Sequence, residues 1–510
     1  MAPYNGGLLR ATGISFAFLA IVPPILYVSY CETIRHAELR RRRERHERKR
    51  AARAIGRSKR EYGVAEGAED GTVEEDSLME DVKEVEEAGE EEKQELRELY
   101  KSIRIGGRYA NPFPEWKEQV GAWEWLVWKL FYQPYTGRFM WNGGTPSSAQ
   151  ELADSLPVEA PDFDLLFGQA LDTEKRVASS SSGSNDGEKE ALADSWDHLS
   201  QPALSDPNSL ASSTEALASP FSTSSNPSQT PRRQVRVGRN TTLTWIGQST
   251  SFVQLDGVGI LTDPVFSHKT IDSFLAPPRL CPCPCTLASL LSIQVVLVSH
   301  SHLDHISPAV PLALGSSVEW VVPLGMRPWF RKLGVADDKI HDLDWWECVE
   351  LELNVPGADG TGAKRKLSIT STAAMHWSAR TPLDTNQSLW CSYVVKGDRD
   401  SYFHCGDTGY SAGLFKAIGR LFGPITFATL PIGAYAPRWH LAPVHMSPED
   451  AVQAHKDIGS KFSVGVHHST WCLSDEHYLA PPKDLAIARE KHGLGERDFC
   501  VVPQGRTIEI

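Results

Sequence analysis

The stretch VVLVSHSHLDHIS (Val295–Ser307) decides both the fold and the chemistry of this chain. Its first part, VVLV, is a short run of apolar residues that predicts a buried strand. Three histidines and one aspartate follow within six positions, namely His300, His302, Asp304 and His305. Imidazole and carboxylate groups bind zinc, manganese or iron, and the H-x-H alternation directs two rings toward one ion. The stretch therefore predicts a metal-binding loop at the end of a buried strand.

Short strands and glycine-containing turns surround this loop in the C-terminal half of the chain. TLTWIG, SFVQL and GVGILTD predict three consecutive strands. Further strands are predicted at VEWVVP, LSITST, LWCSYVV, SYFHCGD, ITFATLP and FSVGVHH. SPEDAVQAHKDIG predicts a helix with Ser447 as its N-cap, Pro448 at its first position and Asp450 completing a capping box. We therefore predict a compact α/β domain over residues 234–510.

Three more candidate metal ligands stand where predicted strands end. They are His376 in AAMHWSAR, Asp407 in HCGDTGY and His467 in VGVHHST. Loops that follow strands present functional groups in layered α/β folds, so we expect these side chains to meet the first cluster. Asp407 is followed by Thr-Gly, which predicts a tight turn from which its carboxylate could bridge two ions.

The N-terminal part of the chain is organised differently. Residues 11–31 contain no charged side chain, and a span of about 20 residues is enough to cross a bilayer. Residues 35–60 then hold 13 Lys or Arg against three Glu, whereas only Arg10 precedes the span. The positive-inside rule therefore places the C-terminal bulk of the chain on the cytosolic or mitochondrial-matrix side. We predict a single-pass membrane anchor over residues 1–34; an arginine-rich start is also typical of mitochondrial import segments.

Three further segments complete the predicted organisation. Residues 61–100 hold 17 acidic side chains against three basic ones, so we predict a basic, then acidic, largely disordered spacer over residues 35–104. The tryptophan-rich residues 105–146 are predicted to form the first ordered part of the α/β domain. Residues 147–233 are rich in Ser, Pro, Ala and Asp and predict a disordered insertion. The net charge of −13 argues against nucleic acid as a partner held by bulk positive charge.

The ordered set of motifs resembles a known family. H-x-H-x-D-H followed by later His, Asp and His resembles the metallo-β-lactamase superfamily. The finer matches resemble the N-acylphosphatidylethanolamine-hydrolysing phospholipase D family within it: NPFPEWKEQ, WIGQST, LTDPVFS, SHSHLDHIS, HWSARTPLD, GDTGY, GAYAPRW and HMSPEDAV. The resemblance extends over about residues 106–146 and 235–480. It implies an αββα sandwich and two zinc ions per subunit.

The resemblance also implies a role for individual residues. One zinc would be held by His300, His302 and His376, and the other by Asp304, His305 and His467. Asp407 would bridge the two ions, and Asp263 in LTDP would orient the ligands of the loop. Leu303 and His445 fall where the family contacts its substrate. Gln248 stands where members of this superfamily often carry His.

The implied activity is that of a membrane-bound phosphodiesterase. A hydroxide generated between two cations would attack the phosphodiester of N-acylphosphatidylethanolamine, releasing an N-acylethanolamine and phosphatidic acid. Asp304 or a metal-bound water would pass a proton to the departing alkoxide, and Asp407 would hold the ions in place. The expected partners are the phospholipid and the membrane, and the resemblance also implies a homodimer. Two alternatives stay open: a nuclease or lactonase of the same superfamily, and a non-catalytic membrane tether.

Overall fold

A seven-stranded sheet carries the SHSHLDH loop. The computed structural model describes residues 27, 29–53, 89–116, 149–167, 241–271, 276–356, 362–381 and 383–510. In strand order the sheet contains β16 (Thr507–Glu509), β3 (Thr242–Gly247), β4 (Thr250–Leu255), β5 (Val258–Thr262), β6 (Val295–Leu297), β7 (Glu319–Pro323) and β8 (Ile340–Leu343). The first four strands pair antiparallel, whereas β5 to β8 run parallel. The predicted strands at TLTWIG, SFVQL and GVGILTD are confirmed as β3, β4 and β5.

A second seven-stranded sheet packs against the first. Its strands in order are β15 (Phe499–Cys500), β14 (Ser460–Val466), β13 (Ile425–Pro431), β12 (Ser401–His404), β11 (Ser392–Lys396), β10 (Gly362–Thr372) and β9 (Cys348–Pro356). The strands from β9 to β12 are antiparallel, and those from β12 to β15 are parallel. The carboxyl ends of neighbouring parallel strands lie at the same edge of a sheet, which gives the loops after β12 and β14 a common side.

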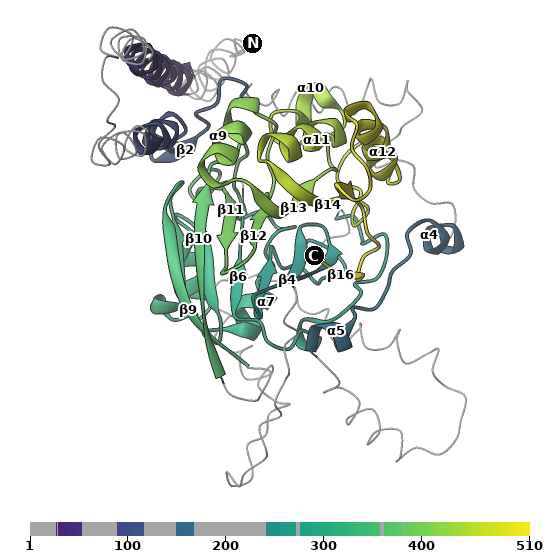
Figure 1. Cartoon of the computed structure of the whole chain (residues 1–510). Helices are drawn as coiled ribbons and strands as arrows, with labels where there is room; N and C mark the ends of the chain where they lie inside the picture. The colour runs from purple at the N-terminus through teal and green to yellow at the C-terminus, as the bar shows by residue number, and fades with distance from the viewer. Residues whose placement is uncertain are drawn as a thin grey trace, which may run out of the picture.

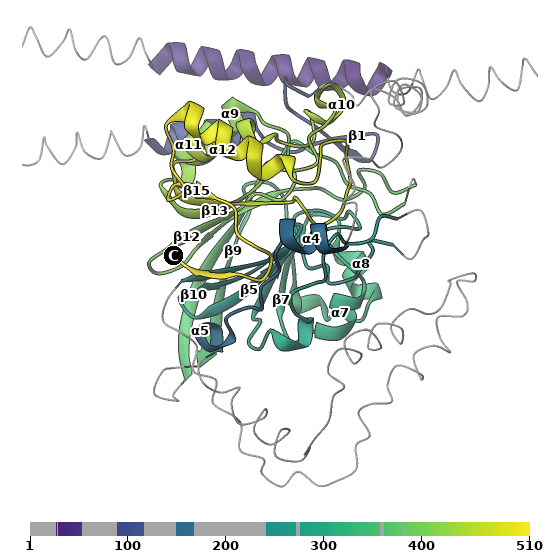
Figure 2. The same ribbon diagram turned by 90° about the vertical axis from the view of Figure 1, so that its right-hand side faces the viewer.

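Helices cover the outer faces of both sheets, which gives the four layers seen in Figure 2. One outer layer holds α9 (Ala412–Phe422), α10 (Arg438–Leu441), α11 (Pro448–Asp457) and α12 (Ala480–His492). The other holds α5 (Phe163–Phe167), α7 (Ala309–Leu314) and α8 (Arg327–Lys332), and two short 3-10 turns are Leu287–Ser289 and Asp337–Lys339. The predicted αββα sandwich is therefore confirmed.

Alternating side chains hold these layers together. In β6, Val295 and Leu297 join the cluster between the sheets, whereas Val296 joins the cluster under α5, α7 and α8. Successive side chains of a strand point to opposite faces, so a strand buried on both sides is apolar throughout. The predicted helix after HMS is also confirmed: the Ser447 hydroxyl accepts from the Asp450 amide, and Pro448 is the first residue of α11.

The prediction of a disordered insertion is wrong for residues 149–167. This segment contains α4 (Ala149–Ser155) and α5. The side chains of Leu166 and Phe167 are fully buried against the first sheet, since the short apolar run FDLLF supplies one side of that core. The rest of the predicted insertion, up to residue 233, lies outside the described residues.

The predicted spacer also contains ordered structure. Residues 29–53 form one long helix and residues 89–99 a second helix, followed by the hairpin β1 (Ile103–Ile105) and β2 (Arg108–Ala110) (Figure 1). The prediction of a largely disordered spacer is therefore wrong for residues 35–53. Arg–Glu pairs three or four residues apart stabilise the first helix, among them Arg35 with Glu32 and Arg42 with Glu38.

Most of the predicted membrane anchor lies outside the described residues, which begin at residue 27. Among the residues that the structure describes, no helix combines the length and the apolar character needed to cross a bilayer. Most of the tryptophan-rich stretch, residues 117–146, is likewise outside the described part of the chain.

Candidate metal centre

Loops from both sheets bring the predicted ligands together at one edge of the sandwich. The SHSHLDH loop follows β6 of the first sheet. His376, Asp407 and His467 follow β10, β12 and β14 of the second sheet. All seven predicted ligands belong to two clusters of metal-binding groups, and within each cluster the candidate ligand atoms lie within 4.8 Å of one another. The sequence prediction that these distant residues meet is therefore confirmed.

The first cluster consists of three imidazoles, from His300, His302 and His376. His300 Nε2 lies 2.8 Å from His302 Nδ1, and His376 Nε2 lies 3.3 Å from the same atom. On the side of its ring away from this cluster, His376 is held by a 2.9 Å contact between its Nδ1 and the carbonyl oxygen of Val444. If Nδ1 donates to that carbonyl, Nε2 keeps its lone pair for a cation.

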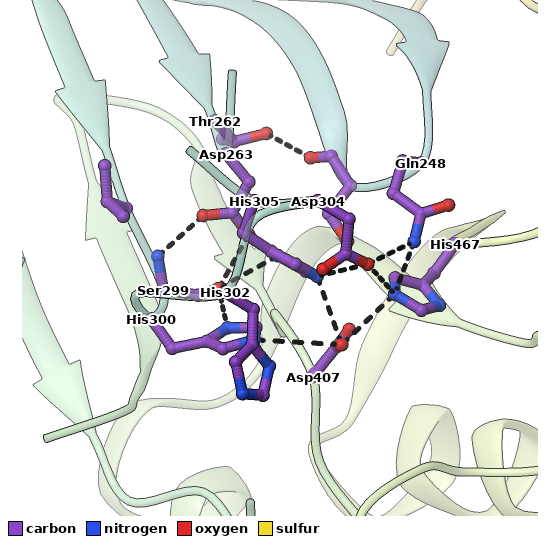
Figure 3. Close-up of polar contacts among 12 residues, drawn as sticks. Gln248, Thr262, Asp263, Ser299, His300, His302, Asp304, His305, Asp407 and His467 are labelled. Atoms are coloured by element: carbon purple, nitrogen blue, oxygen red, sulfur yellow. Dashed lines mark hydrogen bonds and ion pairs between the residues drawn. The ribbon is translucent and has the colours of Figure 1, made fainter. Parts of the chain in front are cut away.

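The second cluster combines two imidazoles with two carboxylates, from His305, His467, Asp304 and Asp407. The Nε2 atoms of His305 and His467 each lie 3.1 Å from Asp407 Oδ2. Asp304 Oδ2 lies 3.6 Å from His305 Nε2 and 3.5 Å from His467 Nε2. Figure 3 shows these four side chains converging, Asp304 and His305 from the loop after β6, and Asp407 and His467 from the loops after β12 and β14.

Asp407 joins the two clusters. Its Oδ2 atom is also 4.0 Å from His300 Nε2 and 3.9 Å from His376 Nε2, so one carboxylate oxygen lies within 4.0 Å of imidazoles from both clusters. Gly406 precedes it with a φ of +59°, and a Cβ there would lie 2.5 Å from Ser299 Cβ. A side chain at residue 406 would therefore push the two ligand loops apart.

The donor set fits two divalent cations. His302 Nε2 and Asp407 Oδ1 are buried and have no hydrogen-bond partner within the described residues. A buried polar atom without a partner costs about 1–3 kcal/mol of stability, and a cation bound by these atoms would offset that cost by giving them a partner. Imidazole and carboxylate ligands in these numbers are suited to zinc, with manganese and iron also compatible.

The first cluster is electrically neutral. Burial lowers the pKa of His302 to about 4, against the opposing charge of Asp304, and lowers the pKa of His376 to about 3, against that of Asp407. Burial and the neighbouring rings also hold the pKa of His300 well below its usual range. All three rings are therefore unprotonated at neutral pH, which is the form that binds a metal.

The second cluster is charged. Burial alone would lower the pKa of His467, but the charge of Asp407 and hydrogen bonds to Asp304 and Asp407 outweigh it and raise the pKa to about 9. Burial is likewise outweighed at His305, whose pKa is raised by Asp407, Asp304 and Asp263. The same pairs keep the pKa values of Asp304 and Asp407 below their usual range, although burial acts in the opposite direction.

Asp263 orients the SHSHLDH loop from a fully buried position at the end of β5. Its Oδ1 accepts from the Ser299 amide at 2.6 Å, and its Oδ2 lies 2.7 Å from the Ser299 hydroxyl and 2.9 Å from His305 Nδ1. Sequence reasoning missed one partner, His404, whose Nε2 lies 2.9 Å from Asp263 Oδ2. Burial opposes ionisation of Asp263, but the two histidines lower its pKa to about 2. The sequence signal that could have identified His404 is its position at the end of the predicted SYFH strand.

Gln248 belongs to the centre itself. Its Nε2 donates to Asp304 Oδ2 at 2.8 Å and lies 2.8 Å from His467 Nε2. The backbone at Gln248 has a φ of 51°, and its carbonyl oxygen accepts from the His467 amide at 2.9 Å. The neighbouring His468 stacks on Trp245 instead, with ring centroids 4.6 Å apart. This arrangement agrees with the choice of His467 over His468 as the candidate ligand.

The two predicted substrate contacts lie beside the clusters. His445 has its ring centroid 5.2 Å from that of His376 and 5.4 Å from that of His467, and its Nδ1 is 3.8 Å from Asp407 Oδ2. Leu303 is half-buried between His302 and Asp304 in the loop. The geometry places both near the ligands, and their contact with a substrate stays a prediction.

Comparison with known proteins agrees with this architecture. Residues 259–468 match the family model described as the beta-lactamase superfamily domain. Among solved structures, the metallo hydrolase Igni18 of Ignicoccus hospitalis is 22% identical, with a TM-score of 0.39, and the match covers 53% of this chain and 98% of that one. Together with the two ligand clusters, the matched superfamily domain defines the class of protein: a metal-dependent hydrolase of the metallo-β-lactamase superfamily.

Two curated relatives narrow this class. The mitochondrial N-acyl-phosphatidylethanolamine-hydrolyzing phospholipase D of Saccharomyces cerevisiae is 30% identical over 413 residues, covering 79% of this chain and 75% of the relative. N-acyl-phosphatidylethanolamine-hydrolyzing phospholipase D 1 of Caenorhabditis elegans is 34% identical over 277 residues, covering 52% and 75% respectively. The chain therefore belongs to the N-acylphosphatidylethanolamine-hydrolysing phospholipase D family.

Proposed function

We propose that this protein is a two-zinc phosphodiesterase that hydrolyses N-acylphosphatidylethanolamine to an N-acylethanolamine and phosphatidic acid at a membrane. The observation that carries the proposal is the position of Asp407 Oδ2, within 4.0 Å of imidazole nitrogens from both clusters. The substrate comes from the activity named for the yeast and nematode relatives. The yeast relative is named as mitochondrial, which supports a mitochondrial membrane. The basic flank at residues 35–60 then favours the matrix side by the positive-inside rule.

The cations would supply the activated nucleophile and charge neutralisation. When bound, two divalent cations lower the pKa of a water from 15.7 toward about 7 and neutralise the charge that develops on phosphate oxygens. In this chain, His300, His302 and His376 would hold one cation, Asp304, His305 and His467 the other, and Asp407 both. No serine or cysteine nucleophile is required by this arrangement.

Asp304 is the residue that we assign to proton transfer. Its side chain is 17% exposed, whereas those of His305, Asp407 and His467 are at most 2% exposed. The Gln248 amide holds one carboxylate oxygen of Asp304 in place. Asp304 can therefore receive a proton at the centre and deliver it to the departing alkoxide oxygen of the N-acylethanolamine.

The test incubates the purified full chain with N-acylated and with plain phosphatidylethanolamine, and identifies the products by mass spectrometry. We expect an N-acylethanolamine and phosphatidic acid from the N-acylated lipid, no turnover after chelation, and recovery on adding zinc. Equal hydrolysis of both lipids would contradict the substrate and leave a phosphodiesterase. A zinc-loaded protein that cleaves neither lipid would contradict the enzymatic proposal and favour a tether.

A further inference from the structure

One face of the long N-terminal helix is fixed to the hydrolase domain. Five of the buried or half-buried side chains recur at helical spacing along residues 29–53: Arg35, Leu39, Arg42, His46 and Arg53. Positions three, four or seven residues apart lie on one side of a helix, so these side chains form a single docking face. In Figures 1 and 2 the helix lies at the end of the molecule that carries α9 and α10.

Polar contacts anchor this docking face. Arg35 is 3% exposed, and its Nη1 donates to the carbonyl oxygens of Asn111 at 3.4 Å and Phe113 at 3.2 Å. Arg42 donates to the carbonyl oxygen of Lys101 at 2.5 Å. Near the end of the helix, Arg53 forms an ion pair with the buried carboxylate of Glu95. The helix is therefore a fixed part of the folded domain over its length.

The opposite side of the helix carries a dense positive charge. Seven basic residues are exposed there and on its flanks, against two exposed glutamates, Glu44 and Glu47; the basic residues are Arg40, Arg41, Arg43, Arg45, Arg48, Lys49 and Arg50. Within the described part of the chain, four of them form no ion pair, namely Arg40, Arg43, Arg45 and Arg50. We call these seven residues the cationic face. Its charge contrasts with the net charge of −13 of the whole chain.

The N-terminal end of the same helix is apolar and exposed. Tyr27 is 46% exposed, Tyr30 59% and Ile34 36%. Tyrosine rings are typical of membrane–water interfaces, where the ring contacts apolar chains and the hydroxyl contacts water. Nucleic acid or an acidic protein would satisfy the arginines, but an exposed apolar end followed by a cationic face matches a bilayer surface better.

We propose that the cationic face binds the headgroups of anionic phospholipids and fixes the orientation of the hydrolase domain on the bilayer. This inference extends the proposed function, and it rests on that function only in taking the bilayer as the source of substrate. Basic residues near an anionic bilayer add roughly equal increments of attraction, which salt screens. Since the helix is fixed to the domain, its contact with headgroups also fixes the domain.

The test compares lipid retention by full-length proteins. The variant replaces the four unpaired arginines by glutamine (R40Q, R43Q, R45Q and R50Q), which keeps a high helix propensity and leaves the docking face intact. The matched control replaces four exposed basic residues on other elements (K332Q, K366Q, K461Q and R497Q). Each protein is equilibrated with non-ionic micelles containing equal phosphatidylcholine and phosphatidylserine, isolated by gel filtration, and its retained lipids are counted by mass spectrometry.

We expect the unaltered protein and the control to retain at least about tenfold more phosphatidylserine than phosphatidylcholine, and the variant to retain the two within about twofold. Raising the salt to 0.5 M should abolish the preference, because the Debye length then shrinks to about 4–5 Å. An unaltered preference in the variant, or none in the native chain, overturns the inference. Selective binding of an oligonucleotide by the native chain without a lipid preference overturns it in favour of nucleic acid.

The same samples separate this inference from the proposed function. Lipid retention requires no turnover, so it is measured on chelator-treated protein as well. Selective retention without hydrolysis of N-acylphosphatidylethanolamine would contradict the proposed function and support the membrane surface. Hydrolysis without selective retention would support the proposed function and contradict the membrane-binding role of the cationic face.

Discussion

The two halves of the metal centre have opposite electrical characters. The cluster of His300, His302 and His376 contains only neutral rings, because burial keeps their pKa values low. The cluster of Asp304, His305, Asp407 and His467 contains two carboxylates and two histidines whose pKa values are raised. In the metal-free protein the second cluster is therefore stabilised by ion pairs between protonated histidines and carboxylates, whereas the rings of the first cluster are already in the uncharged form that binds a cation.

The difference shows that two kinds of buried site lie side by side at one edge of the sandwich. The rings of the first cluster are buried in their uncharged form, and backbone or hydroxyl contacts such as that of His376 with Val444 hold them in place. In the second cluster the carboxylates balance the charge of the protonated histidines until a cation replaces the extra protons. Asp407 contacts the ligands of both clusters, and its removal should therefore have the largest effect.

The first prediction breaks the link between the clusters with Asp407→Asn. We expect loss of the second zinc and a fall in turnover of at least about a thousandfold, equivalent to ~4 kcal/mol of transition-state stabilisation. The neutral cluster should still hold one zinc per chain, which elemental analysis would detect. Circular dichroism checks that the fold is retained. Two bound zinc ions with full turnover would contradict a bridging role.

The second prediction sharpens the contrast through pH. His467 has a pKa of about 9 in the metal-free protein, so zinc must displace a proton from it below that pH, and His305 behaves likewise. Zinc affinity at the second position should rise by up to about tenfold per pH unit per displaced proton from pH 6.5 toward 9. Affinity at the first position should change little, because the pKa values of His302 and His376 are about 4 and 3.

Competition with a chromophoric chelator at several pH values measures both affinities. Equal pH dependence at the two positions would refute the assignment. The metal-free protein supplies a check of the sign. A raised folded-state pKa at His467 contributes stability that is full below the unfolded value of about 6.5 and is lost as pH rises through about 9, so metal-free stability should decline over that window.

The third prediction concerns support of the charged cluster. Asp263→Asn removes the charge that faces His305 and His404, and we expect zinc affinity at the second position to fall by about 10–100-fold. Asp256→Asn is the matched control, because Asp256 is buried in the turn between β4 and β5, where it accepts from Arg399 and the Asp398 amide. The control should lower the melting temperature without changing zinc affinity; an equal loss of affinity in both would make the role of Asp263 merely structural.

The sequence contained enough to predict the sandwich and its seven candidate ligands. Apolar runs such as VVLV specify buried strands, and the order of motifs specifies which strand ends carry ligands. It could not predict His404 or the contact of Gln248 with Asp304. A single histidine or glutamine has no local pattern, and its partner is chosen by contacts between residues more than 50 positions apart.

The N-terminal helix was missed for a related reason. A run of arginines predicts a solvated segment unless its docking partner is known. For Arg35, that partner consists of the backbone carbonyls of Asn111 and Phe113, which do not depend on side-chain identity and leave no motif. α5 was missed because a five-residue helix is too short to show periodicity, so that only burial of Leu166 and Phe167 distinguishes it from a linker.

Asn111 links the N-terminal helix to the metal site, and this link limits how far the protein can be shortened from its N-terminus. Its carbonyl oxygen accepts from Arg35, while its side-chain amide donates to the carbonyl oxygen of His376 at 2.8 Å. A recombinant fragment that begins after residue 53 would retain every candidate metal ligand and still lose the guanidinium that supports the loop holding one of them. Domain boundaries drawn around the hydrolase fold alone would therefore cut through the support of its metal site.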